Sequence, residues 1–442
     1  MVRQNDVIAP QRARRPRTLV LIAGVTVVLL VGWTAFLGIG AIEGWLRRPI
    51  APRGDAPAFA ETARAVMERE NAGNIAFALL DGGRVVAEHF ASKGAAVDRD
   101  SLFQVASLSK WVTAWGVMKL AEEKRIDLDA PVSTYLARWR LPDGEFDEAQ
   151  VTVRRLLSHT AGLTDGLGYG GFPPGEPIQP LVDSLTLAID ASPGADGRVR
   201  VGAPPGESFE YSGGGYALLQ LLVEEVSGEP FSTYMKRAVL DPLGMERSTY
   251  LLPDNVANVA EFFDTDGSKA IHYRFSAPAA ASLYTSAADM SRFLQAHVAG
   301  ENSEPPGRGV LTPKSLEDMR RPHADQFGAE IWGMGTILYA PNDAGGFVIG
   351  HDGSNTPAIN TSARIDPASG DGIVVLETGH TRLATDIAGE WVFWNTGNVD
   401  LFVVLADLRR ALPVLVGGWL ALVIGAILAG FVVVGGRRRA SA

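Results

Sequence analysis

Ser107-Leu108-Ser109-Lys110 places a hydroxyl and an amine three residues apart. On a helix, residues i and i+3 share a face, so the Lys110 amine can reach the Ser107 hydroxyl. A serine hydroxyl becomes a nucleophile when a base takes its proton, and a neutral lysine can be that base. The pair predicts acyl transfer through an acyl-serine. A Ser-x-x-Lys also arises by chance in a chain with seven lysines, so its surroundings must support it.

The segment Ser107–Arg125 has the spacing of a helix. The helical stripe that holds Ser107 and Lys110 continues through the apolar residues Ala114 and Val117. A lysine on an apolar stripe is partly shielded from water, and desolvation disfavours the charged amine. The helix therefore predicts a lysine that can act as a base.

The remaining periodic segments predict the elements that position this pair. A hairpin turn at 81–83 joins two strands, Ile75–Leu80 and Arg84–Phe90. Helices are expected at Glu61–Asn71, Tyr216–Val226, Phe231–Val239, Ala287–Ala299 and Ala384–Trp394, and late strands at Val348–Gly350, Thr361–Ile365 and Gly372–Glu377. Strands at both ends with helices between them predict an α+β fold, a mostly antiparallel sheet whose terminal helices cover one face.

Two long segments carry no formal charge: Leu19–Ile42, with 24 residues, and Ala411–Gly436, with 26. At about 1.5 Å per residue, either helix spans the roughly 30 Å of a bilayer core. A buried core helix is the alternative for both segments. A cleaved signal peptide is a further alternative for the first.

The charges are unevenly distributed along the chain. Four arginines lie within residues 12–17 and three within 437–439, beside the apolar segments. By the positive-inside tendency, both ends are cytoplasmic and the body lies outside. Residues 49–408 carry 28 basic and 48 acidic side chains, a net charge of −20, so nucleic acid is not expected as a partner. The absence of cysteine excludes disulfides and thiolate metal sites.

The predicted organisation is a two-pass protein of the cell membrane with an extracytoplasmic body. Its expected partners are membrane lipid around two helices and a small-molecule or peptide substrate. Six regions follow one another: a basic cytoplasmic tail (1–17), a transmembrane helix (18–42), a linker (43–58), one folded hydrolase domain (59–400), a second transmembrane helix (411–435) and a second basic cytoplasmic tail (436–442).

Several sequence blocks support the Ser-x-x-Lys pair. They are FQVASLSKWVTAW from Phe103, VTVRRLLSHTAGL from Val151, FEYSGGGYALL from Phe209, DPLGMERSTY from Asp241, SLYTSAADMSRFL from Ser282 and GHDGSN from Gly350. In this order they resemble the serine β-lactamase-like family, the group of class C β-lactamases, D-aminopeptidases, DD-peptidases and related esterases. The resemblance runs from about Phe103 to Asn355, more weakly to Gly379, and implies a β-lactamase/transpeptidase-like fold with a mostly helical subdomain.

The resemblance implies that Ser107 is the acylated nucleophile, Lys110 its proton acceptor and Tyr211, in Tyr-Ser-Gly, a second acid/base. A phenol can act as a base only beside a cation such as Lys110, so the two would titrate as a coupled pair. An alternative for Tyr211 is a half-buried strand tyrosine.

His351, Gly353 and Ser354 fall where the family has a Lys-Thr-Gly or His-x-Gly element at the sheet edge. The resemblance implies that the backbone N–H groups of Ser107 and Ser354 form an oxyanion hole. For His351, a solvent-facing strand histidine is the alternative.

Two departures from the family pattern bear on the substrate. Gly213 stands where the family has an asparagine, and His351 replaces a lysine. Both changes weaken the grip on a carboxylate-bearing lactam. We therefore expect a serine hydrolase acting on amides or esters, such as D-amino-acid peptides or small esters. A β-lactamase is the first alternative, and a penicillin-binding-like sensor or binding protein without turnover is the second.

Other chemistries have little support. The chain has no Gly-x-Ser-x-Gly and no His-Glu-x-x-His, and its seven histidines lack metal-ligand spacing, so neither a metal nor a cofactor is expected. Ser158-His159-Thr160 is interpreted as a structural turn that shapes the cleft. Gly213-Gly214-Gly215 is interpreted as a close-packing turn, not as a phosphate loop.

Overall fold

The computed structural model describes residues 15–45, 47–164, 170–253 and 255–435. Residues 1–14 of the first predicted tail and the whole second tail at 436–442 lie outside the described residues. The chain divides into two compact units, one of residues 1–48 and 401–442 and one of residues 49–400. The larger unit holds every candidate catalytic residue.

An eight-stranded antiparallel sheet is the centre of the larger unit, which confirms the predicted α+β class. In spatial order its strands are β2 (Arg84–Ala91), β1 (Ile75–Asp81), β10 (Gly372–Thr378), β9 (Ile359–Ile365), β8 (Phe347–Asn355), β7 (Ile337–Pro341), β6 (Ala329–Trp332) and β5 (Ala324–Gln326). The first two strands therefore pair with the last one, which brings distant parts of the chain together.

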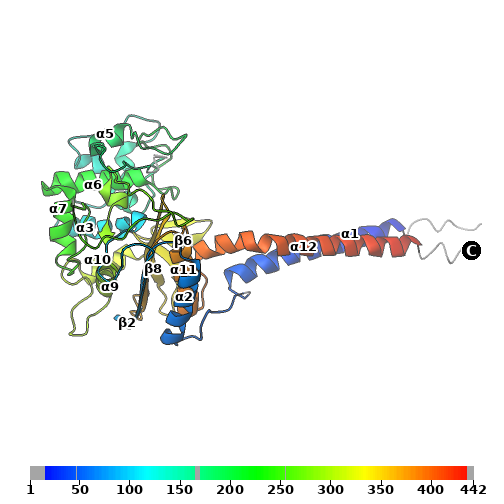
Figure 1. Cartoon of the computed structure of the whole chain (residues 1–442). Helices are drawn as coiled ribbons and strands as arrows, with labels where there is room; N and C mark the ends of the chain where they lie inside the picture. Colours follow the sequence, from blue (N-terminus) through cyan, green and yellow to red (C-terminus); the bar gives the residue numbers. More distant parts are fainter. Residues whose placement is uncertain (1–14, 46, 165–169, 254, 436–442) are drawn as a thin grey trace, which may run out of the picture. The chain divides into compact units, whose positions relative to one another are not determined.

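Helices cover both faces of this sheet. α2 (Ala56–Glu70) packs on β1 and β2, and α11 (Leu383–Thr396) packs on β9 and β10, so the terminal helices share one face as predicted (Figure 1). α9 (Ala287–Gln295) packs against β1, β9 and β10, and belongs to the largely helical half of the unit. Because both faces are covered, β9 and β10 are buried along their whole length, whereas β2 at the edge is not.

The helical half contains α3 (Ser109–Glu122) and α6 (Gly213–Ser227), with α8 (Pro278–Ala281) packed against both. Its other elements are η1 (Ala106–Leu108), η2 (Val132–Thr134), η3 (Glu148–Gln150), α4 (Val153–Leu157), α5 (Leu181–Thr186), α7 (Phe231–Met235), η4 (Lys236–Leu240) and α10 (Pro313–Met319), with a small pair of strands, β3 (Phe103–Gln104) and β4 (Tyr284–Thr285). Most of these short elements were not predicted.

Several predicted elements differ from the observed ones. The helix expected at Ser107–Arg125 starts as the 3₁₀ turn η1 before α3, and the helix expected at Phe231–Val239 divides into α7 and a π-helical turn, η4. Helix α9 ends at Gln295 and not at Ala299. Strand β8 runs on through 351–355, where glycine and polar residues have weak strand propensity, because pairing with β9 decides the conformation.

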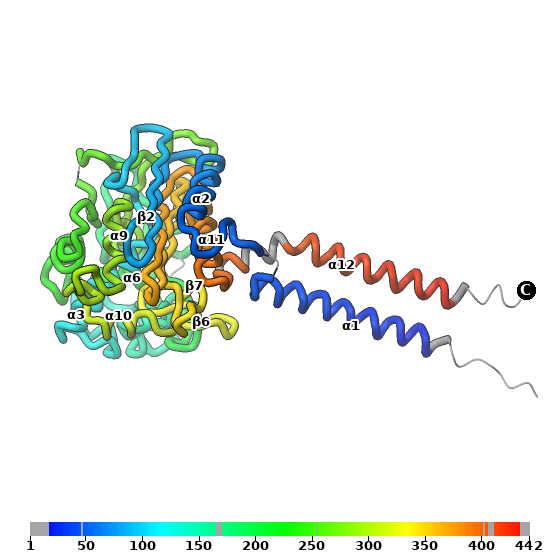
Figure 2. Tube along the Cα trace, turned by 90° about the horizontal axis from the view of Figure 1, so that it is seen from below, coloured from blue at the N-terminus to red at the C-terminus, as the bar shows by residue number. Residues whose placement is uncertain are grey.

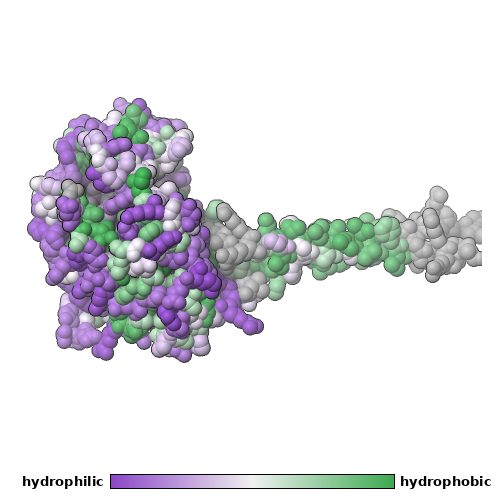
Figure 3. Space-filling view, in the orientation of Figure 1, coloured by the Kyte–Doolittle hydropathy of each residue, from purple (hydrophilic) through white to green (hydrophobic). Residues whose placement is uncertain are grey.

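The smaller unit contains two long helices, α1 (Arg15–Ile42) and α12 (Leu401–Gly435), which lie side by side (Figure 2). The Trp419 indole N–H donates to the Thr34 hydroxyl at 3.0 Å. Within them, Arg17–Ile42 and Ala411–Val433 are long and apolar enough to cross a membrane, and their apolar side chains are exposed (Figure 3). A core helix of a soluble protein would bury such residues.

Candidate active site

Ser107 lies in the turn η1 that precedes α3, and Lys110 lies in the first turn of that helix. The Lys110 Nζ donates to the Ser107 Oγ at 3.1 Å and to the Ala280 carbonyl in α8 at 2.8 Å. Lys110 is only 1% exposed, so the expected shielding from water is present. The buried amine is thus within proton-transfer distance of the hydroxyl.

The turn that carries Ser107 is fixed from several sides. Ala106 has a φ of +46°, a region that side-chain-bearing residues rarely adopt, so the surroundings must hold it there. Ser109 Oγ donates to the Ala106 carbonyl at 2.6 Å and accepts from the Leu283 N–H at 2.8 Å. On the sheet side, the Thr361 hydroxyl of β9 donates to the Val105 carbonyl at 2.9 Å. Ser109 and Thr361 therefore position the candidate nucleophile.

Tyr211 lies in a loop directly before α6, so the alternative of a half-buried strand tyrosine is wrong. The Lys110 Nζ is 5.0 Å from the centroid of its ring, so the distant tyrosine does meet the Ser–Lys pair. Tyr211 is 46% exposed, which leaves it accessible to a substrate. The structure therefore brings Ser107, Lys110 and Tyr211 together.

His159 holds the loop of Tyr211 in place. It has a φ of +56°, its carbonyl accepts from the Glu210 N–H at 2.8 Å, and its Nδ1 accepts from the Ser212 N–H at 3.1 Å. Its ring lies 4.4 Å, centroid to centroid, from the Tyr211 ring. Burial and the nearby Lys110 keep the pKa of His159 well below its usual value, so Nδ1 stays an acceptor.

Ser158 and His159 do not form a catalytic pair. The buried Ser158 hydroxyl donates to the Arg154 carbonyl at 2.9 Å and shares a hydrogen bond with the Thr160 hydroxyl at 2.9 Å. The interpretation of this tripeptide as a structural turn agrees with these bonds.

His351 occupies β8 on the side of the site. Only 2% of it is exposed, so the alternative of a solvent-facing strand histidine is wrong. Its Nδ1 lies 2.6 Å from the Asp352 carbonyl, and its buried Nε2 has no hydrogen-bond partner. Burial first, and the charge of Lys110 second, lower the pKa of His351 to about 4. The imidazole is therefore neutral near pH 7 and does not replace the charge of a lysine.

Gly353 allows β8 to approach the turn that carries Ser107. A Cβ on this glycine would lie 2.0 Å from the Val105 carbonyl oxygen and 2.5 Å from the Thr361 Oγ1. Ser354 follows with an exposed side chain. Since β7 pairs with β8 only from Phe347 to Gly350, the edge of β8 beyond Gly350 is open on the β7 side. Its backbone groups can then meet a substrate.

Aromatic rings surround the candidate base. The Trp332 ring of β6 lies 4.9 Å from the His159 ring, 5.4 Å from the His351 ring and 5.6 Å from the Tyr211 ring. Tyr216 of α6 lies below Lys110, with 5.6 Å between the Lys110 Nζ and its ring centroid. The role of Trp332 could not be predicted from the sequence, because nothing in its local pattern separates it from an ordinary core residue.

Gly213 opens α6, which Ser212 caps by accepting the Gly215 N–H at 2.8 Å. The glycine run is therefore the first turn of a helix, and Gly214 and Gly215 are buried in it, which agrees with the interpretation as a close-packing turn. At the helix start Gly213 has no side chain to offer to the cleft. Among the described residues, no group of three or more His, Asp or Glu side chains is placed to hold a metal ion.

The sequence and the structure resemble known serine hydrolases. The Beta-lactamase family model matches residues 59–391, so the chain belongs to this family, whose members share the serine β-lactamase/transpeptidase fold. Penicillin-binding protein 4 of Amycolatopsis lactamdurans is 31% identical over 319 residues, which cover 67% of this chain and 78% of that protein. Esterase EstB of Burkholderia gladioli is 27% identical over 283 residues, 57% of this chain and 69% of the esterase.

Solved structures show the same fold. The octameric penicillin-binding protein homologue from Pyrococcus abyssi aligns with a TM-score of 0.61 at 24% identity, covering 76% of either chain. A β-lactamase/D-alanine carboxypeptidase from Pseudomonas syringae aligns with a TM-score of 0.58 at 19% identity, covering 76% of this chain and 97% of its own.

Proposed function

We propose that the protein is a membrane-anchored, extracytoplasmic serine hydrolase that cleaves amide or ester bonds through an acyl-enzyme on Ser107. The observation that carries this proposal is the hydrogen bond of 3.1 Å between the buried Lys110 Nζ and the Ser107 Oγ. Burial disfavours the ammonium form, and a neutral amine can take the hydroxyl proton.

In the acylation step, the Ser107 Oγ attacks the carbonyl carbon as its proton passes to the Lys110 Nζ. The carbonyl oxygen becomes an oxyanion, which the backbone N–H groups of Ser107 and Ser354 stabilise. The tetrahedral species collapses, the bond to the amine or alcohol breaks, and the leaving group takes the proton of Tyr211, which becomes a phenolate beside the Lys110 ammonium. The products of this step are an acyl-Ser107 ester and the free leaving group.

In the second step, water attacks the ester. The Tyr211 phenolate accepts a proton from this water, and the Ser107 oxygen leaves and takes back its proton from the Lys110 ammonium. The hydrolysis regenerates the enzyme and releases a carboxylic acid. His159 acts as a positioning residue here, because its Nδ1 and carbonyl hold the two backbone N–H groups on either side of Tyr211.

Small esters and D-amino-acid peptides are the favoured substrates, ahead of β-lactams. A neutral His351 and the absent side chain of Gly213 remove two groups that would bind a lactam carboxylate and amide. Relatives include an esterase and a penicillin-binding protein, which supports an acyl-transfer reaction but not one substrate. The Gly213 departure also supports a second candidate, a sensor that acylates without turnover.

The membrane placement rests on α1 and α12 and on the arginines beside them in the sequence. Protease treatment of intact cells tests it: we expect digestion of the body, and an undigested body would place it in the cytoplasm.

An activity screen tests the function. The full chain in lipid nanodiscs is offered p-nitrophenyl esters, D-aminoacyl amides and a chromogenic cephalosporin, with Ser107→Ala as the control. Ester or amide hydrolysis that the control lacks supports the proposal. A stable Ser107 adduct without turnover favours the sensor. Hydrolysis that persists in Ser107→Ala contradicts both.

A further inference from the structure

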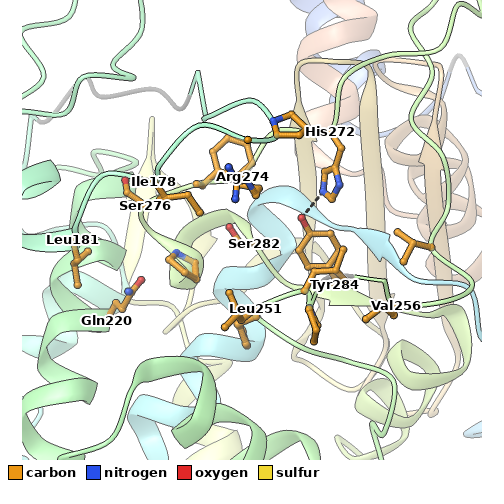
Figure 4. A pocket seen from close by; sticks show the side chains of 18 of the residues that line it. Ile178, Leu181, Gln220, Leu251, Val256, His272, Arg274, Ser276, Ser282 and Tyr284 are labelled. Carbon is orange, nitrogen blue, oxygen red and sulfur yellow. Dashed lines mark hydrogen bonds between the residues drawn. The ribbon is translucent and has the colours of Figure 1, made fainter.

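A cavity of about 720 Å³ lies in the helical half, between α6, the segment 272–284 and two loops (Figure 4). This volume is within the roughly 300–1,000 Å³ of small-molecule sites. None of the described residues that line it is Ser107, Lys110 or Tyr211. Two lining residues, Pro278 and Ser282, flank Ala280, whose carbonyl accepts from Lys110. The cavity therefore borders the candidate active site without containing its reactive groups.

Apolar side chains form much of its wall. Ile178 and Leu181 come from the loop before α5 and from α5 itself, and Leu251 and Val256 come from a second loop. Leu251 is 63% exposed, so the cavity is open to solvent beside it. Such a wall suits an alkyl or aryl body, which gains roughly 25 cal/mol for each Å² of apolar surface removed from water.

Two arginines line the cavity, and only one of them has a carboxylate partner among the described residues. Arg138 lines the cavity and is neutralised by Glu224 at 2.6 Å and Glu225 at 3.2 Å. Arg274 also lines it, but among the described residues its guanidinium donates only to two backbone carbonyls, those of Pro173, at 3.1 Å, and Glu176. Its Nε is buried without a partner, and no described carboxylate forms an ion pair with it. Arg274 is thus a cation with spare donor capacity at an apolar cavity.

A second polar group, the hydroxyl of Ser282, belongs to a residue that lines the same cavity as Arg274. Ser282 is 5% exposed, and its buried Oγ has no hydrogen-bond partner. Figure 4 shows Arg274, Ser276 and Ser282 among the side chains that line the cavity, together with Leu251 and Val256. A buried unpartnered polar atom costs about 1–3 kcal/mol, so it favours a ligand that satisfies it.

We propose that this cavity is a binding site for a small organic carboxylate with an apolar alkyl or aryl body. The carboxylate accepts hydrogen bonds from the Arg274 guanidinium and the Ser282 hydroxyl, and the body packs against Leu251 and Val256. The site is independent of acyl transfer, because the ligand does not react with Ser107.

A photoreactive carboxylate tests the site on the full chain in phosphatidylcholine nanodiscs. The probe is 4-(trifluoromethyl-diazirinyl)benzoate, with the matching benzyl alcohol as its uncharged control and 4-phenylbutanoate as the competitor. Labelled peptides are identified by mass spectrometry. We expect the carboxylate to label peptides that contain Leu251 or Ile178, at least fivefold more than the alcohol does, and 4-phenylbutanoate to suppress this labelling. Because this comparison uses the unaltered protein, it does not depend on a variant that folds.

Two arginine variants give a matched comparison. Arg274→Gln should reduce carboxylate labelling at least fivefold and leave labelling by the alcohol unchanged. Arg308 also holds a loop through backbone carbonyls but lines a different part of the surface, so Arg308→Gln should label like the unaltered protein. Ser107→Ala should also label normally, which separates this site from the proposed hydrolase. Equal labelling by both probes, labelling that 4-phenylbutanoate does not suppress, or labelling confined to peptides with Ser107 or Tyr211 would overturn the proposal.

Discussion

Two adjacent residues of β8, His351 and Asp352, differ in whether their buried polar atoms have hydrogen-bond partners. His351 faces the candidate active site, where its Nε2 is buried without a partner and its imidazole is neutral. Asp352 accepts from the Ser362 hydroxyl at 2.5 Å and from the Arg364 guanidinium at 3.0 Å. Arg364 is fully buried and is also paired with the buried Asp400. On the side of Asp352, the charged groups are all paired with one another. On the side of His351, a buried nitrogen has no hydrogen-bond partner among the described residues.

The difference separates polar groups that stabilise the fold from those available to a substrate. Buried polar groups normally find partners, and those around Arg364 do. On the catalytic side, three buried nitrogens lack a partner among the residues that the structure describes: the Nε2 of His159, the Nε2 of His351 and the Nε1 of Trp332. A buried polar atom without a hydrogen-bond partner reduces stability. Several such atoms beside Ser107 and Lys110 are therefore typical of a substrate-binding site.

The largest effect is expected from Lys110→Met. This change removes the amine that takes the Ser107 proton, so the acylation rate should fall roughly 10³–10⁴-fold. The fold should remain, because methionine suits the apolar surroundings of this helix face. Acylation is measured with a fluorophosphonate probe and folding by circular dichroism. A folded variant with a near-normal rate would show that Lys110 is not the base.

Substitutions in the ion-pair network around Arg364 should lower the free energy of unfolding and leave the acylation rate unchanged. Arg364→Met leaves the carboxylates of Asp352 and Asp400 buried without their cation, which should lower the free energy of unfolding by about 3–5 kcal/mol. In the control Arg382→Met, the exposed pair of Arg382 with Asp386 is lost, at a cost below about 1 kcal/mol. Both are compared by denaturant unfolding. Similar small losses would contradict the structural role of the network.

More of the candidate active site than of the ion-pair network around Arg364 could be predicted from the sequence. The helix stripe predicted a shielded Lys110, and the ordered blocks brought Tyr211 and His351 to the same site. Nothing in the sequence paired Arg364 with Asp352 and Asp400, because such pairing depends on the β8–β9 register and on a chain separation of up to 36 residues. The Ala280 carbonyl and Trp332 were missed for the same reason, since tertiary packing decides their positions.

Glu377 of β10 provides a smaller, pH-dependent test. Burial raises its pKa to about 9, and one of its oxygens has no partner. Because the unfolded carboxyl titrates near its ordinary 4.5, unfolding releases a proton between about pH 4.5 and 9. This group therefore makes the fold less stable as pH rises through that range, by roughly 1 kcal/mol per pH unit.

Glu377→Gln cannot ionise, so it should remove this slope and be the more stable variant at pH 8. Thermal unfolding at pH 5, 6.5 and 8 is the measurement. The buried His351 has the opposite sign, because its lowered pKa removes stability as pH falls from about 6.5 to 4. A slope that persists in Glu377→Gln would contradict the assignment.

The smallest effect is expected from Gly213→Asn, which adds a side-chain amide at the candidate active site. The first turn of α6 tolerates asparagine, and the amide can bind a substrate carbonyl. We expect acylation by a penicillin to accelerate about tenfold, with little change for a p-nitrophenyl ester. Gly213→Ala is the control for the helix start. If Gly213→Ala accelerates acylation by penicillin as much as Gly213→Asn does, the effect comes from the helix backbone, and the predicted role of the amide is wrong.

The most direct test of the central claim is the site at which a fluorophosphonate becomes attached to the full chain, determined by peptide mass spectrometry. We predict one adduct, on Ser107, beside the shielded Lys110. An adduct on Ser158, the other serine with a histidine neighbour, or no adduct at all would contradict the account.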